Sequence, residues 1–171
     1  MYAYRILAAL FATAVGMSSG TGGQLPSRSD NAVAFPIGTW RLVLADYRPD
    51  DKSPWVHAYG EHPKGYLVYD QTGHMFVQIS NDPPTPPFAG GDDYKPTERE
   101  AKTAYLNYVA YFGTYSLDPL RHVITHRVEG SLLPSFTATD QERSYKLQGD
   151  TLELSDWKTW RAVWVRVRAP N

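Results

Sequence analysis

The sequence contains no cysteine among its 171 residues. This absence excludes a disulfide framework, thiolate catalysis, an iron–sulfur site and a zinc site with cysteine ligands. The chain also lacks a basic excess, because 17 Lys and Arg are set against 18 Asp and Glu and the formal net charge is −1. Proteins that bind the phosphate backbone need clustered positive charge. We therefore expect no nucleic-acid partner.

Long apolar runs are also scarce, and the clearest one lies at the N-terminus. Arg5 precedes an apolar run over residues 6–17, which small residues follow over 18–23. This order is typical of a secretory leader. The run is shorter than the roughly 20 residues that cross a bilayer, and a buried N-terminal helix is the alternative interpretation. We predict a signal peptide over 1–23, a flexible spacer over 24–35, a periplasmic or secreted protein, and no stable membrane insertion after the leader is removed.

Motifs that identify a reaction are missing as well. We find no nucleophile elbow, phosphate loop, Ser-His-Asp order or paired-carboxylate spacing. Among the five histidines, His122 and His126 share a predicted strand, but four residues of strand rise separate them by roughly 13 Å. That separation is too long for one metal ion. We predict no metal site and no cofactor, and we assign no catalytic residue.

Aromatic residues are abundant: 12 Tyr and 5 Trp contribute to an aromatic content of 13%. Flat aromatic side chains favour strands. Short strand patterns separated by turn residues are predicted over 38–47, 65–69, 75–79, 111–117, 122–129, 141–147, 151–155 and 160–168. A proline-rich loop is predicted over 81–94. The fold class is therefore all-β, a single domain over 36–169 that forms a closed antiparallel up-and-down barrel of about eight strands.

One short helix is predicted within this β-rich pattern. Thr97 and Glu100 have the spacing of a capping box, in which each side chain bonds the backbone of the other residue. Apolar residues then recur at helical spacing, which predicts that one face of the helix packs on the sheet. These residues are Ala101, Ala104, Tyr105 and Tyr108.

Strand alternation predicts a partly polar interior. Glu142, Ser144 and Lys146 are solvent residues, so the alternate residues Gln141, Arg143, Tyr145 and Leu147 face inward. In 151–155, Leu152 and Leu154 face inward, whereas Thr151, Glu153 and Ser155 face water. His126 is the inward polar group of its strand, and Tyr111, Gly113 and Tyr115 share one face.

A buried Arg or His needs partners, because an unpaired buried charge costs several kcal/mol. We predict an amphipathic cavity with ligand-binding residues Tyr111, Tyr115, His126, Arg143 and Tyr145. The alternative is that the same side chains form a satisfied internal hydrogen-bond network without a ligand.

A resemblance to a known family rests on several short sequence motifs. Gly38-Thr39-Trp40 resembles the G-x-W signature on the first strand of lipocalins, and Arg166 is placed to cover that tryptophan. Further short motifs follow, with an order and spacing similar to those of one family: Pro63-Lys64-Gly65-Tyr66-Leu67, Gly73-His74-Met75, Tyr111-Phe112-Gly113-Thr114-Tyr115 and His126-Arg127-Val128-Glu129-Gly130-Ser131. From Pro36 to Arg168 the chain resembles the bacterial and fungal lipocalin-like domain family, a calycin-type barrel. The structural signature would be Gly38, Trp40 and Arg166.

The resemblance implies a lipocalin-like barrel without agreed catalytic residues. Some such proteins act as isomerases or cyclases on hydrophobic substrates. Our leading expectation is an exported protein whose partner is a small hydrophobic or amphipathic ligand, mainly apolar and with one polar or acidic group near Arg143 and His126. The alternative is an isomerase, cyclase or hydratase that uses His126 or a tyrosine for proton transfer. A third expectation is a structural or adhesion barrel with a filled core, which predicts no cavity large enough for a ligand. The oligomeric state is left open.

Overall fold

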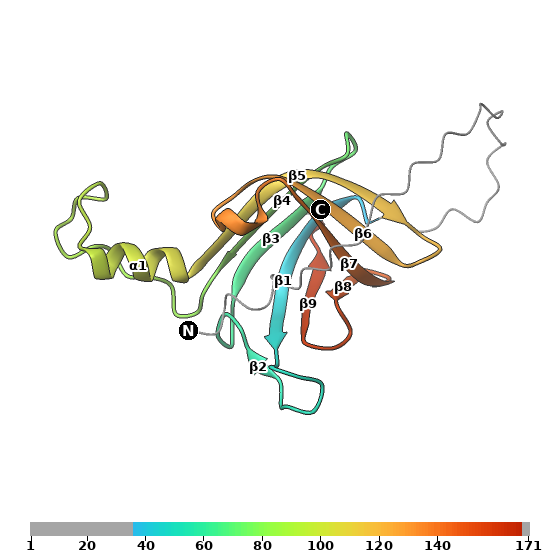
Figure 1. Cartoon of the computed structure of the whole chain (residues 1–171), viewed down its shortest axis with the longest axis horizontal. Coiled ribbons are helices and arrows are strands. Elements are labelled where there is room, and N and C mark those ends of the chain that lie inside the picture. Colours follow the sequence, from blue (N-terminus) through green and yellow to red (C-terminus); the bar gives the residue numbers. More distant parts are fainter. Residues whose placement is uncertain (1–35, 169–171) are drawn as a thin grey trace.

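Eight antiparallel strands close into one barrel in the computed structural model, which describes residues 36–168 (Figure 1). The strands are β1 (Gly38–Tyr47), β3 (Lys64–Tyr69), β4 (His74–Ser80), β5 (Tyr108–Asp118), β6 (Val123–Ser131), β7 (Thr139–Gln148), β8 (Thr151–Ser155) and β9 (Trp160–Arg166). Each pairs with its neighbour in chain order, and β9 pairs with β1 to close the ring. The predicted barrel is confirmed. The predicted leader and spacer lie outside the described residues.

A short additional strand, β2 (Val56–His57), pairs with the end of β1 outside the ring. Within residues 36–168, no helix has the length and apolar character to span a membrane.

The interior follows the predicted alternation with two exceptions. Gln141, Arg143 and Tyr145 are buried, and so are Leu152 and Leu154 on the next strand. The first exception is in β1, where alternation predicts that Trp40, Leu42 and Leu44 share one face. A register shift between Leu42 and Leu44 instead moves Ala45 and Tyr47 into the core and leaves Leu44 only half-buried.

The second exception is Ser155, which we predicted to face water. Its side chain is buried, with 1% exposed. β8 ends at this residue, and Asp156 begins a turn back to β9. Because Ser155 is the last residue of β8, the alternation of the strand does not predict whether its side chain is buried.

One end of the barrel is closed by the predicted signature residues. The indole N–H of Trp40 donates to the carbonyl of Pro36 at 2.7 Å, and the Arg166 guanidinium lies 4.1 Å from the centre of the Trp40 ring. Nη1 of Arg166 also donates to the carbonyl of Ile37 at 2.5 Å. Gly38 has a φ of 135°, and a Cβ there would lie 2.8 Å from this same Nη1. The close approach of Arg166 thus requires a glycine.

The opposite end is covered by two buried aromatic side chains. Tyr59 follows β2, and Phe136 lies in the 3-10 helix η2 (Pro134–Phe136); their exposed fractions are 1% and 2%. The carbonyl of Tyr59 accepts from the backbone N–H of Asp82 at 2.8 Å. Nearby, the buried Asp46 carboxylate accepts from Arg161 at 2.7 and 2.9 Å and lies 2.8 Å from Nδ1 of His57. This cluster fixes β2 to the barrel.

The predicted helix is present as α1 (Glu98–Leu106), and both hydrogen bonds of its capping box are formed. The prediction that it packs on the sheet is wrong, because no residue of α1 is buried. In Figure 1, α1 extends away from the barrel together with the proline-rich loop. Tyr108, which we predicted on the same helix face, instead begins β5, because the helix ends at Leu106.

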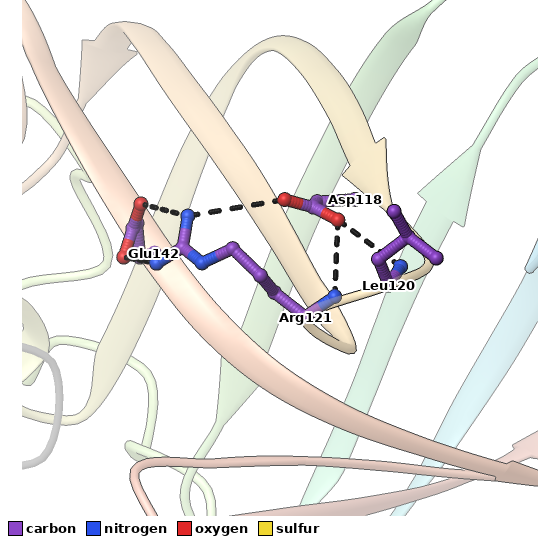
Figure 2. Close-up of polar contacts among 4 residues, drawn as sticks. All are labelled: Asp118, Leu120, Arg121 and Glu142. Carbon is purple, nitrogen blue, oxygen red and sulfur yellow. Dashed lines mark hydrogen bonds and ion pairs between the residues drawn. The ribbon is translucent and has the colours of Figure 1, made fainter.

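The turn between β5 and β6 is tied to β7 by charged side chains (Figure 2). The Asp118 carboxylate accepts from the backbone N–H groups of Leu120 and Arg121 at 3.1 and 3.0 Å. The Arg121 guanidinium reaches Glu142 of β7 at 3.3 Å. The carboxylate of Glu142 is therefore paired on the outside of the barrel, although its neighbour in sequence, Arg143, is inside.

Candidate ligand-binding site

A buried polar chain crosses the barrel interior. The Tyr69 hydroxyl lies 2.6 Å from Nε2 of His126, and the Tyr111 hydroxyl lies 3.2 Å from Nδ1 of the same ring. A neutral imidazole has one donor and one acceptor nitrogen. One tyrosine therefore donates to the ring and the other accepts from it. Both nitrogens of His126 are engaged by the protein itself.

Burial controls the ionisation of this chain. It lowers the pKa of His126 well below its usual range, and the charge of Arg143 lowers it further. Burial raises the pKa of Tyr69 well above that of a free tyrosine, and it also raises the pKa of Tyr111. All three groups are therefore neutral near pH 7.

Arg143 continues the chain but lacks a counter-ion. Its charge, and then its hydrogen bond to the Tyr111 hydroxyl, partly oppose the rise in that tyrosine's pKa. Its other acceptors are neutral oxygens at 3.2 Å, the side chain of Gln141 and the carbonyl of Glu142. Throughout residues 36–168 no carboxylate forms an ion pair with Arg143, although it is only 2% exposed. A buried cation without a paired anion is energetically costly.

A cavity of about 30 Å³ lies beside Arg143. One water molecule requires roughly 10–15 Å³ of such space, so the cavity has room for about two. Its lining is mostly apolar and comes from both walls and one end of the barrel, with Ala45, Tyr59, Val77, Ile79, Tyr111, Arg143, Leu154, Trp160, Ala162 and Trp164. The barrel is therefore nearly filled, and a larger ligand requires the lining to move.

Two tryptophans of this lining have unused hydrogen-bond donors. The Nε1 atoms of Trp160 and Trp164 are buried without a partner, and the Arg143 guanidinium lies 5.1 Å from the centre of the Trp160 ring. Buried N–H groups are normally paired. Two residues of the lining thus carry a buried donor without an acceptor, while the surface that faces the cavity is almost wholly apolar.

The structure brings together only part of the predicted ligand-binding set. Tyr111 and Arg143 line the cavity, whereas His126 contacts Tyr111 and is not in the lining. The Tyr115 hydroxyl donates to the carbonyl of Asp70 at 2.7 Å, near the closed end. Tyr145 faces His122 with ring centres 5.6 Å apart and lines an outer groove instead.

Sequence reasoning missed the two tryptophans. Alternation along β9 places Trp160, Ala162 and Trp164 on one buried face. The same period-2 argument that identified Arg143 would have found them. Their importance lies in the unpaired N–H groups, which depend on the surrounding side chains.

Comparison with known proteins agrees with this architecture. The model of the lipocalin-like domain family matches residues 37–166. Among curated proteins, the chain is similar to the 4'-hydroxy-3'-methoxypropiophenone carrier protein of Aspergillus oryzae, with 36% identity over 88 residues, which cover 47% of this chain and 78% of the carrier. The family match spans the whole barrel, from β1 to β9. The chain therefore belongs to the lipocalin-like domain family.

Proposed function

We propose that this protein binds a small, mainly apolar molecule inside the barrel and holds its polar or acidic group against Arg143. The lipocalin-like barrel and the similarity to a carrier protein support small-molecule binding. The observation that carries the finer proposal is the buried guanidinium of Arg143, which has neutral partners only. A ligand oxygen would complete its hydrogen bonds, and a carboxylate would also neutralise its charge.

The apolar walls supply the remaining affinity. Apolar surface removed from water contributes about 25 cal/mol per Å². Ligand binding enlarges the cavity, because the present volume of about 30 Å³ holds only water-sized molecules. The relative carries an aryl ketone by its name, and such a molecule has the required form, a flat apolar body with oxygen acceptors.

Binding can be measured with two probes, 4'-hydroxy-3'-methoxypropiophenone and dansyl-labelled undecanoic acid. Quenching of tryptophan fluorescence reports the first, and dansyl emission reports the second. We expect Arg143→Leu to weaken binding of the fatty acid by about tenfold or more, since a charge-assisted hydrogen bond contributes roughly 1.5–3 kcal/mol. Arg127→Leu is the matched control, because Arg127 is an exposed arginine on β6. Failure of both probes to bind the wild type, or equal affinity in Arg143→Leu, would refute the proposal.

We also propose that the protein acts after export, in the periplasm or outside the cell. The support is the sequence of residues 1–23, in which Arg5, an apolar run and small residues follow in the order of a secretory leader. Expression of the full chain with cell fractionation and N-terminal sequencing tests this. A mature protein that begins near residue 24 in the exported fraction is expected, whereas an uncleaved chain in the cytosol contradicts export.

A further inference from the structure

The wall of the barrel is incomplete beside Arg143. β8 pairs with residues 144–148 of β7 and with residues 161–165 of β9. In the described part of the chain, no strand pairs with residues 139–143 of β7 on the β8 side. This half of β7 and the start of β9 therefore face each other across a gap that side chains fill.

An outer cleft of about 200 Å³ lies over this gap. It is lined by Val123, Asp140, Glu142, Arg143, Ser144, Ser155, Asp156 and Trp160. Arg143 and Trp160 line the inner cavity as well, and they are the two residues that the linings share. The partition between cleft and cavity thus consists of the Arg143 guanidinium and the Trp160 indole.

This partition is held weakly from within. The Arg143 contacts to Gln141 and Glu142 are both 3.2 Å long and go to neutral oxygens. Nε1 of Trp160 and Oγ of Ser155 are buried without a hydrogen-bond partner, and Ser155 is only 1% exposed. Leaving a buried polar group unpaired costs roughly 1–3 kcal/mol. Three polar side chains therefore meet at the gap with unused hydrogen-bonding capacity.

The acidic residues of the cleft are already engaged elsewhere. Asp156 accepts from the backbone N–H groups of residues 158–160 at 2.7–3.1 Å. Glu142 pairs with Arg121 at 3.3 Å, and Asp140 lies 3.9 Å from Nε of Arg127. Among the buried polar groups at the gap, those left for a ligand are thus the Arg143 guanidinium, the Trp160 N–H and the Ser155 hydroxyl.

Both barrel ends are fixed more firmly than the gap. At one end, Arg166 covers Trp40 and bonds the backbone of Ile37. At the other, Tyr59 is anchored by its backbone, and the Asp46 carboxylate ties β9 to β2. Opening either end breaks an ion pair, Arg166 with Asp150 at 3.6 Å or Arg161 with Asp46 at 2.7 Å. Moving Arg143 from Trp160 breaks hydrogen bonds to uncharged oxygens and a ring contact, but no ion pair.

We infer that the ligand enters through this gap and binds across it, with its apolar body in the inner cavity and an acceptor oxygen held by Arg143, Trp160 and Ser155. The inference rests on the proposed function, since it assigns the polar subsite of the same ligand. The ligand class is an apolar molecule with a terminal carboxylate or carbonyl oxygen. The outer cleft and the inner cavity become one continuous cavity when the Arg143 guanidinium moves away from the Trp160 ring.

The absence of cysteine makes a thiol test direct. Ser155→Cys introduces a single thiol at the gap, and Val128→Cys introduces one at an inward position of β6 that is equally buried but lines neither space. We expect a thiol reagent such as DTNB to modify Ser155→Cys about tenfold or more faster than Val128→Cys, because local opening needs less free energy than global unfolding. Saturating dansyl-labelled undecanoic acid should slow the first reaction and leave the second unchanged.

Each outcome separates the two proposals. If both thiols react equally slowly, ligand entry through the gap is wrong. If Ser155→Cys reacts fast but the bound fatty acid does not slow it, the ligand does not bind across the gap. The proposed function stands in both cases. If the fatty acid and the propiophenone both fail to bind the wild type, the proposed function fails and the ligand site fails with it. Urea unfolding of both variants verifies that they are folded.

A second pair of variants covers the case in which Ser155→Cys does not fold. Ser144→Trp fills the cleft, and Lys146→Trp adds the same bulk two residues further along β7, outside the cleft lining. Stopped-flow dansyl emission should show slower association of the fatty acid in Ser144→Trp by about tenfold, the order expected when binding requires a rearranged entry path. Unchanged association in Ser144→Trp would overturn entry through the gap.

Discussion

The hydroxyl of Tyr69 lies 2.6 Å from Nε2 of His126, and this contact joins β3 to β6 across the barrel interior. Tyr69→Phe leaves that nitrogen without its partner at a position with no solvent exposure. We expect a loss of about 1–3 kcal/mol in the free energy of unfolding, the cost of an unsatisfied buried polar group. Urea denaturation measures it. Tyr66→Phe removes the same atom from an exposed tyrosine of β3 and should change stability by less than about 0.5 kcal/mol; equal effects of the two substitutions would contradict the role of the buried contact.

The lowered pKa of His126 predicts a loss of stability in mild acid. In the folded protein the ring stays neutral well below its usual pKa, whereas in the unfolded chain it takes up a proton near pH 6.5. The unfolded state therefore binds more protons as the pH falls below about 6.5, and His126 contributes a loss that approaches 1.4 kcal/mol per pH unit. This loss continues until the pH reaches the folded pKa.

The measurement compares wild type with His126→Gln by urea denaturation at pH 7 and pH 5. The wild type should lose more stability than the variant over this interval, by at most about 2 kcal/mol, because only the wild type carries the titrating ring. Other histidines and the carboxylates contribute equally to both proteins and cancel in the difference. Parallel pH dependence of the two proteins would show that His126 titrates normally in the folded state.

Much of the interior could be predicted because strand alternation is a local property. Alternation places Arg143 inside the barrel because its two sequence neighbours are solvent residues. It places His126 inside because Ile124 and Val128 share its face of the strand. The burial of Ser155 could not be predicted in this way, since it depends on where β8 ends and on how Asp156 turns the chain. The register shift after Leu42 likewise reverses the faces of β1 without a local sequence signal.

The candidate site was predictable in its chemistry but not in its size. Alternation identifies inward donors, yet the volume left beside Arg143 depends on Tyr59 and on the walls that converge there. These segments are remote in sequence. The absent counter-ion of Arg143 is similarly non-local, because Glu142 is adjacent in sequence but pairs with Arg121 outside the barrel (Figure 2).

Gly38 is predicted to be intolerant of any side chain. Its φ of 135° is a conformation that only glycine adopts readily, and a Cβ would lie 2.8 Å from Nη1 of Arg166. Gly38→Ala should lower the free energy of unfolding by about 2 kcal/mol or more, from backbone strain and from displacement of Arg166 off Trp40. Gly73→Ala is a useful control, because Gly73 also has positive φ but has no atom near its Cβ position. Thermal unfolding should show the larger loss for Gly38→Ala, and similar losses would mean that strain alone is responsible.

The Asp46 carboxylate is predicted to hold β9 and β2 together at the end covered by Tyr59. It is almost fully buried, whereas its partner Arg161 keeps 38% of its side chain exposed. Asp46→Asn removes the charge and retains the shape, so Arg161 loses its ion pair. We expect a loss of about 1–3 kcal/mol in the free energy of unfolding, below the range for fully buried pairs because water still reaches Arg161.

A double-mutant cycle separates this ion pair from general damage to the barrel end. Arg161→Gln alone should cost a similar amount, and the double variant should be less destabilised than the sum of the single ones, with a coupling energy of about 1 kcal/mol or more. His57→Ala serves as a further test, because His57 contacts the same carboxylate from β2. Additive losses for Asp46→Asn and Arg161→Gln would show that the two side chains act independently, and that β2 and Tyr59 are held by backbone hydrogen bonds instead.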